Sequence, residues 1–141
     1  MSSNPFCFEL VPVWCQFQQV CTRLLRCGSR VRVLANAQHE PAGWFWNAYA
    51  TALQYSGGRN EAETYFSKSI ERAKARGWRR LEALAPHHFG RSLAEQNRFV
   101  EAESRISEAL AIRIELNEPR QESSRRALVK LAALQRRQGL A

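Results

Sequence analysis

A pattern of large and small side chains recurs along the chain about every 40 residues, and it constrains the fold more than any other feature of the sequence. Each copy has a large residue, then a large-small pair three positions on, then a further residue three positions after the small one. The copies are Trp46-Tyr49-Ala50-Leu53, Pro86-Phe89-Gly90-Leu93 and Leu128-Leu131-Ala132-Gln135. After the first two copies a second motif follows, as Ala62-Phe66 and Ala102-Ile106. Self-similarity at such a period is typical of repeat architectures, in which each unit packs on its neighbours.

The spacing of these residues predicts helices. Steps of three and four positions place each set on one helical face. The small residues Ala50, Gly90 and Ala132 allow a paired helix to come close, and the bulky residues Phe66, Ile106 and Leu110 are expected to fill the space between successive pairs. The composition agrees, because Val, Ile and Thr are sparse beside Ala, Leu, Arg, Glu and Gln. We predict an all-α protein with helices at about 42–56, 60–76, 79–96, 99–116 and 121–138.

Turn residues mark the ends of these helices. Gly57-Gly58 and Gly77 are expected to end two of them, and Pro41 can occupy the first turn of another. Asn60, with Glu63 three residues later, predicts a capping box that opens the second helix. Pro86 is expected to kink its helix or to delay its start.

Together these motifs resemble the tetratricopeptide repeat (TPR), whose first helix carries the large, large-small, large pattern and whose second carries Ala-x3-Phe. The resemblance covers residues 42–141, about two and a half repeats, and the period of 40 to 42 residues is similar to that of the longer TPR variety. Pro86 and Gln135 depart from the family pattern, and the third repeat lacks its second helix. The resemblance implies antiparallel helix pairs stacked as a short α-solenoid that acts as a protein-binding scaffold.

In TPR arrays the first helix of each pair lines a concave groove, and the resemblance assigns groove positions here. Trp44 is added to these positions as an aromatic ligand-facing residue. The groove positions are then Trp44, Asn47, Thr51, Gln54, His87, His88, Arg91, Arg126 and Lys130. Trp46 and Tyr49 fall on packing positions, so they are assigned to the core. Chaperone-adaptor TPRs clamp a peptide carboxylate with five Lys, Asn and Arg side chains; only Arg126 and Lys130 match that clamp, with the two types exchanged. A groove that prefers an acidic or polar segment is expected, with a solvated helix face as the alternative for these basic residues.

The charge of the chain is lopsided. Its 141 residues carry a net charge of +8, with 18 Arg, three Lys, 13 Glu and no Asp. Such an excess favours an acidic partner, but anionic protein, nucleic acid and anionic lipid all satisfy it. Residues 113–141 contribute seven bases against three acids, so a basic helical-repeat RNA- or DNA-binding protein is the leading alternative to a protein-binding module.

The sequence favours a non-catalytic protein. His87 and His88 are adjacent, so on a helix they point about 100° apart and do not readily converge on one metal ion. Ser107, Ser123 and Ser124 lack the spacing of an activated nucleophile, and no Gly-rich phosphate-binding motif occurs. No cofactor is therefore expected.

Residues 1–41 form a separate segment rich in Cys and aromatic residues. Cys7, Cys15, Cys21 and Cys27 have spacings unlike those of a zinc clasp, so reduced thiols in a cytoplasmic protein are expected, with zinc binding as the minor alternative. Helices within 9–35 are expected to form a degenerate preceding repeat; an organellar transit peptide is the other interpretation of this Arg-rich stretch. No apolar run approaches the roughly 20 residues of a membrane span, so no membrane partner is expected. The unpaired C-terminal helix offers a contact for a dimer.

Overall fold

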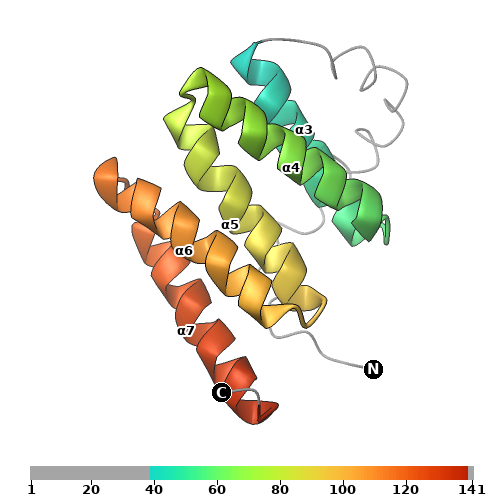
Figure 1. Cartoon of the computed structure of the whole chain (residues 1–141), viewed down its shortest axis with the longest axis vertical. Helices are drawn as coiled ribbons and strands as arrows, with labels where there is room; N and C mark the ends of the chain where they lie inside the picture. Colours follow the sequence, from blue (N-terminus) through green and yellow to red (C-terminus); the bar gives the residue numbers. More distant parts are fainter. Residues whose placement is uncertain (1–38, 140–141) are drawn as a thin grey trace, which may run out of the picture.

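The computed structural model describes residues 39–139, and these residues form five helices without a strand (Figure 1). The helices are α3 (Glu40–Tyr55), α4 (Arg59–Arg76), α5 (Arg79–Glu95), α6 (Phe99–Glu115) and α7 (Gln121–Arg137). Each begins and ends within two residues of its predicted position, so the all-α prediction is confirmed. The predictions for the four cysteines and for helices within 9–35 lie outside the described residues.

The helices pack mainly on their neighbours in sequence. Helix α3 packs on α4, α4 on α5, α5 on α6 and α6 on α7. Two further contacts skip a helix, because α3 touches α5 and α5 touches α7 over smaller areas. Helix α5 is thereby in direct contact with both α3 and α7.

The turns that end the helices repeat at an interval of 40 residues. Gly57 and Asn97 both have positive φ, at 93° and 60°, and so do Gly77 and Asn117, at 69° and 50°. The residue after each turn donates its backbone N–H to a carbonyl five residues earlier, at 2.8 to 3.0 Å. This bond pattern is that of the Schellman motif, which satisfies the last carbonyls of a helix. The sequence repeat is therefore also a repeat of backbone geometry.

One prediction about a helix start is wrong, and so is one of the two alternatives for Pro86. Asn60 does not cap α4, because that helix begins one residue earlier, at Arg59; Gly58 occupies the cap position and makes no side-chain hydrogen bond there. Pro86 does not delay α5, which begins at Arg79 and contains Pro86 in its interior. Leu81, Ala83 and Ala85 are fully buried in the turns before Pro86, and Arg79 pairs with Glu82 in the first turn. This packing stabilises the segment that the proline alone would disfavour.

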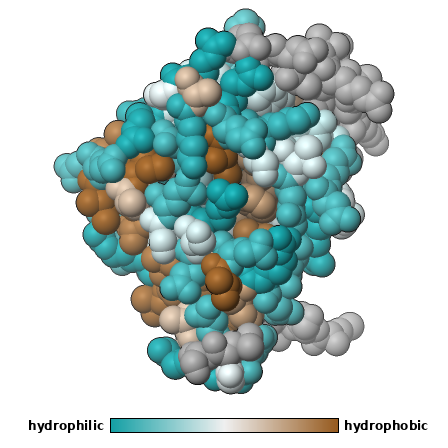
Figure 2. Space-filling model, in the orientation of Figure 1, coloured by the Kyte–Doolittle hydropathy of each residue, from teal (hydrophilic) through white to brown (hydrophobic). Residues whose placement is uncertain are grey.

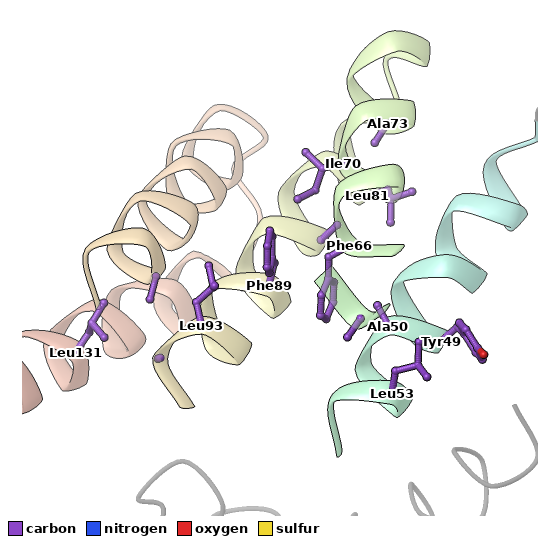
Figure 3. Close-up of a cluster of buried hydrophobic side chains, with 14 of the residues drawn as sticks. Tyr49, Ala50, Leu53, Phe66, Ile70, Ala73, Leu81, Phe89, Leu93 and Leu131 are labelled. Carbon is purple, nitrogen blue, oxygen red and sulfur yellow. The ribbon is translucent and has the colours of Figure 1, made fainter. Parts of the chain in front are cut away.

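The core lies between the helices at the repeated positions (Figure 3). Phe66 and Phe89 stack with ring centroids 5.3 Å apart, and Ala50 and Leu93 are buried beside them. Gly90 lies directly against α6, because a Cβ atom there would come 2.5 Å from Ile106 Cγ1 and 3.0 Å from the Ala102 carbonyl oxygen. The predicted close approach at the small positions is therefore confirmed for Gly90.

Gly90→Ala should lower the free energy of unfolding by about 1–3 kcal/mol, because the added methyl group overlaps both a side chain and a backbone oxygen. Gly43→Ala is the matched control. The three atoms nearest to a Cβ atom at Gly43 all belong to the side chains of Leu81 and Trp78, whereas at Gly90 a backbone oxygen is also in the way. Urea denaturation of the two variants checks the prediction, and a loss at Gly43 as large as that at Gly90 would contradict it.

Asn97→Ala should lower the free energy of unfolding by about 1 kcal/mol, whereas Asn97→Gly should leave it unchanged or raise it. A left-handed residue with a Cβ atom is strained by roughly 1–2 kcal/mol, and Asn tolerates the conformation better than Ala. Thermal and urea unfolding give the comparison. Equal stabilities of the Ala and Gly variants would show that the turn does not require positive φ.

Candidate functional site

Polar side chains fill the contacts between α3, α5 and α7, and we call this set the polar seam. Its members are Asn47, Gln54, His87, His88, Glu95, Arg113 and Ser124. The seam joins α3 to α5 through two side-chain pairs: Asn47 donates from Nδ2 to His88 Nδ1 at 3.2 Å, and Gln54 donates from Nε2 to Glu95 Oε2 at 2.6 Å. Both pairs join residues 41 positions apart, and within each helix they are seven residues apart.

The seam continues from α5 to α7 and α6 through Ser124. Arg113 donates from Nη1 to Ser124 Oγ at 2.8 Å and to the Arg120 carbonyl oxygen at 3.1 Å. Ser124 Oγ lies 3.1 Å from His87 Nδ1. The Ser124 hydroxyl oxygen therefore contacts both the Arg113 guanidinium group and the His87 ring. The arginine thus fixes α7, the loop before it and α5 in one network.

Arg113 is the most unusual member of the seam, because only 2% of it is exposed. Its Nε atom is 3.8 Å from Glu118 Oε2, which is an ion pair too long for a hydrogen bond. Burial lowers the pKa of Arg113 from its ordinary value, while Glu118 acts in the opposite direction.

Burial also changes the titration of the other seam residues. Burial is the main cause that lowers the pKa of His87 to about 3, and the charge of Arg113 is the next cause. Burial likewise lowers the pKa of His88 to about 4, and there the charge of Arg91 is the next cause. Burial raises the pKa of Glu95, although the bond from Gln54 opposes it. Both imidazoles are therefore neutral near pH 7, where they accept hydrogen bonds and are poor general bases.

The predicted groove residues lie at different depths. Asn47, Gln54 and His87 are buried; Trp44, Thr51, His88 and Arg91 are partly buried; Arg126 and Lys130 are exposed. Trp44 packs against the apolar core and donates from Nε1 to Glu40 Oε1 at 3.1 Å. Thr51 donates to the Asn47 carbonyl oxygen at 2.9 Å. The structure thus brings Asn47, Gln54, His87 and His88 together in the seam, and Trp46 and Tyr49 are in the core as expected.

Three members of the seam were not among the predicted site residues. Glu95 lies seven residues after His88, so the helical spacing could have found it. Arg113 stands 40 residues after the core residue Ala73, which is a recognisable anomaly in the repeat. Ser124 carries no such signal, because its partners come from α5 and α6.

The two adjacent histidines serve different helices. His88 faces Asn47 of α3, His87 faces Ser124 of α7, and their ring centroids are 6.1 Å apart. Within residues 39–139 no group of three or more His, Cys, Asp or Glu side chains is arranged to hold a metal ion. In the same part of the chain, no helix has the length and apolar character that crossing a membrane requires.

Comparisons with protein-family models, with curated proteins and with solved structures found no match to this chain.

Stability should fall as the pH falls from about 6.5 toward 4. The folded protein holds His87 and His88 neutral, so below their ordinary pKa of about 6.5 the unfolded chain binds more protons than the folded chain. The slope approaches about 1.4 kcal/mol per pH unit for each imidazole. Urea denaturation at pH 7.5, 6.5 and 5.5 measures this slope.

The double variant His87→Gln with His88→Gln should flatten this pH dependence. His39→Gln is the control, because His39 is exposed just before α3. A pH profile unchanged in the double variant would contradict the assignment of the acid sensitivity to the seam.

Proposed function

We propose that the chain is a non-catalytic, TPR-like protein-interaction module. In this proposal α3 with α4 and α5 with α6 are antiparallel pairs of a short solenoid, and α7 is the first helix of a third repeat. Two observations support it: the turns recur at 40 residues, and every second helix contacts the next of its kind. Both are what stacked helix pairs require.

The proposed ligand surface is the face formed by α3, α5 and α7. The observation that carries the proposal is the exposure and charge pairing of Arg91 on α5. It is partly exposed and forms no ion pair with a described residue, whereas Arg98 and Arg105 of the same repeat pair with Glu101 and Glu108. Glu95, one turn later, is electrostatically coupled to Arg91 but accepts its hydrogen bond from Gln54, so the guanidinium group of Arg91 can still pair with a carboxylate of a partner.

Other residues of this face fit the same kind of ligand. Arg126 and Lys130 are exposed one turn apart on α7, and the exposed ion pair of Arg126 with Glu122, at 3.7 Å, contributes little. Thr51 is partly buried beside the uncharged seam residues of α3. We infer a groove that holds an acidic or polar segment of another protein, with positive charge toward α5 and α7.

A nucleic-acid ligand is the second candidate, and the charge of α7 favours it. This helix has five basic residues and one Glu. Proteins that bind single strands combine such charge with aromatic side chains on which bases stack. Helix α7 has no aromatic residue, and Trp46, Tyr49, Phe66 and Phe89 are buried in the core. A protein segment is therefore the better fit.

The proposal is tested with a fluorescent acidic peptide and a labelled single-stranded RNA, each titrated with the full chain at two salt concentrations. Arg91→Glu, and the pair Arg126→Glu with Lys130→Glu, should each weaken peptide binding by about 1–3 kcal/mol. The pair Arg136→Glu with Arg137→Glu is the matched control for the charge change on α7 and should have less effect. Circular dichroism confirms that each variant is folded.

Two results would contradict the proposal. One is tight RNA binding that falls about equally for every base removed and drops steeply with salt, because that pattern belongs to contacts with phosphates. The other is peptide binding that is lost as strongly in the control pair as in the groove variants.

A further inference from the structure

Helix α7 lacks the cover that α5 has at the matching positions of the repeat. On α5 the positions of the pattern are Pro86, Phe89, Gly90 and Leu93, all of them buried, and α6 is the helix that packs most extensively on α5. On α7 the matching residues Leu128, Ala132 and Gln135 are only partly buried, and only Leu131 reaches the core. Val129 follows Leu128 directly on α7, and 68% of this residue is exposed.

We call Leu128, Val129, Ala132 and Gln135 the open flank. Its shape matches the surface on which α6 lies. Ala132 occupies the position of Gly90, where α6 comes so close that no methyl group fits. Ala132 lies between Leu128 and the polar Gln135 on this flank, and a small residue at that position lets a second helix pack closely. Figure 2 shows brown, hydrophobic residues exposed on the side of the molecule where α6 and α7 lie.

Charge decides which helix could cover the open flank. Arg136 is exposed one turn after Ala132 and forms no ion pair with any residue in 39–139. A second copy of the chain would bring two α7 helices together, each with five bases and one Glu. Residues 1–38 are also basic, with four Arg and one Glu. Like charges disfavour both, so the complementary partner is an acidic helix.

Helix α6 shows what such a helix looks like. It carries four Glu and two Arg, and its buried residues include Ala102, Ile106 and Ala109. We propose that the open flank of α7 docks an acidic amphipathic helix of another protein, which lies on α7 as α6 lies on α5. The apolar stripe of that helix covers Leu128 and Ala132, and its acidic side chains pair with Arg136.

The open flank is separate from the proposed groove, although the residues of both are assigned by aligning α7 with α5 in the sequence repeat. At about 100° per residue, Arg126 and Lys130 lie about 120° to 160° around α7 from Leu128 and Ala132. A ligand on one face therefore does not need the residues of the other.

The probe is a synthetic peptide that copies residues 99–115, with blocked ends and a fluorescent label, titrated with the full chain. A free helix of this length is marginal in water, so we expect a saturable but weak Kd of about 10–500 μM. Ala132→Arg should weaken binding at least tenfold, because a long side chain blocks close approach. Arg136→Glu should weaken it at least fivefold. Arg137→Glu is the matched control, the same charge change on another face of α7 and outside the proposed groove, and should stay within twofold.

A second measurement does not depend on variants. Peptide added to the isotopically labelled chain should shift the backbone NMR signals of Leu128, Ala132, Gln135 and Arg136. A peptide with its four Glu replaced by Gln should bind at least fivefold more weakly.

Several outcomes would overturn the proposal. They are no saturable binding at about 1 mM peptide, equal loss in Arg137→Glu and Arg136→Glu, and NMR shifts centred on Gly90. Shifts centred on Gly90 would mean that the peptide replaces α6. Sedimentation adds another: a dimer that Ala132→Arg dissociates would make a second copy the occupant. The Arg91→Glu variant distinguishes the open flank from the groove. If it loses binding of the acidic peptide but still binds the helical peptide, the two surfaces are separate.

Discussion

The close contact of α6 with α5 at Gly90 is the constraint on which the rest of the architecture depends. The pair packs so closely that the glycine has no room for a Cβ atom, and this closeness brings Phe89 and Leu93 into the buried cluster with Phe66. An amphipathic helix of this length is only marginally stable alone, so each one depends on the neighbour that covers its apolar face. The small residues at the repeated positions therefore determine both the helix pairing and the distance between pairs.

The polar seam is the second organising feature, and it balances two large effects. Placing Arg113, His87 and Asn47 in the interior costs desolvation free energy, which hydrogen bonds to Ser124, to Arg120 and between the helices offset. Such bonds require a particular register between α3, α5 and α7, whereas apolar contacts would tolerate sliding. The seam thereby fixes the relative position of helices that share little other contact.

Much of the fold could be predicted because its signals are local. Gly57 and Gly77 lie where the left-handed turns occur, and the spacing of Trp46, Tyr49 and Leu53 gave the correct buried face of α3. Asn60 was assigned to a cap because its sequence motif fits, but the preceding glycines let α4 begin one residue earlier.

The depth of the candidate site was harder to predict than the helices. Helical register places Asn47 and His88 on the proper face, but whether a polar residue lies in solvent or between helices depends on how close the next helix comes. The same is true of Arg113, whose long side chain reaches a serine and a carbonyl of another repeat. Such partners are far from any local pattern, so only the assembled structure shows them.

The small number of buried residues on α7 has a consequence for the cooperativity of the molecule. Only Ser124, Ala127 and Leu131 of this helix are fully buried, and the serine depends on Arg113 and His87 for its hydrogen bonds. In stacked helix pairs each unit is stabilised by its nearest neighbours, so the helix with the smallest interface separates at the lowest cost. We therefore expect α7 to be a sub-global unfolding unit that detaches while α3 to α6 stay folded. Its detachment would expose Arg113 to water without disturbing the packing of Gly90 against α6.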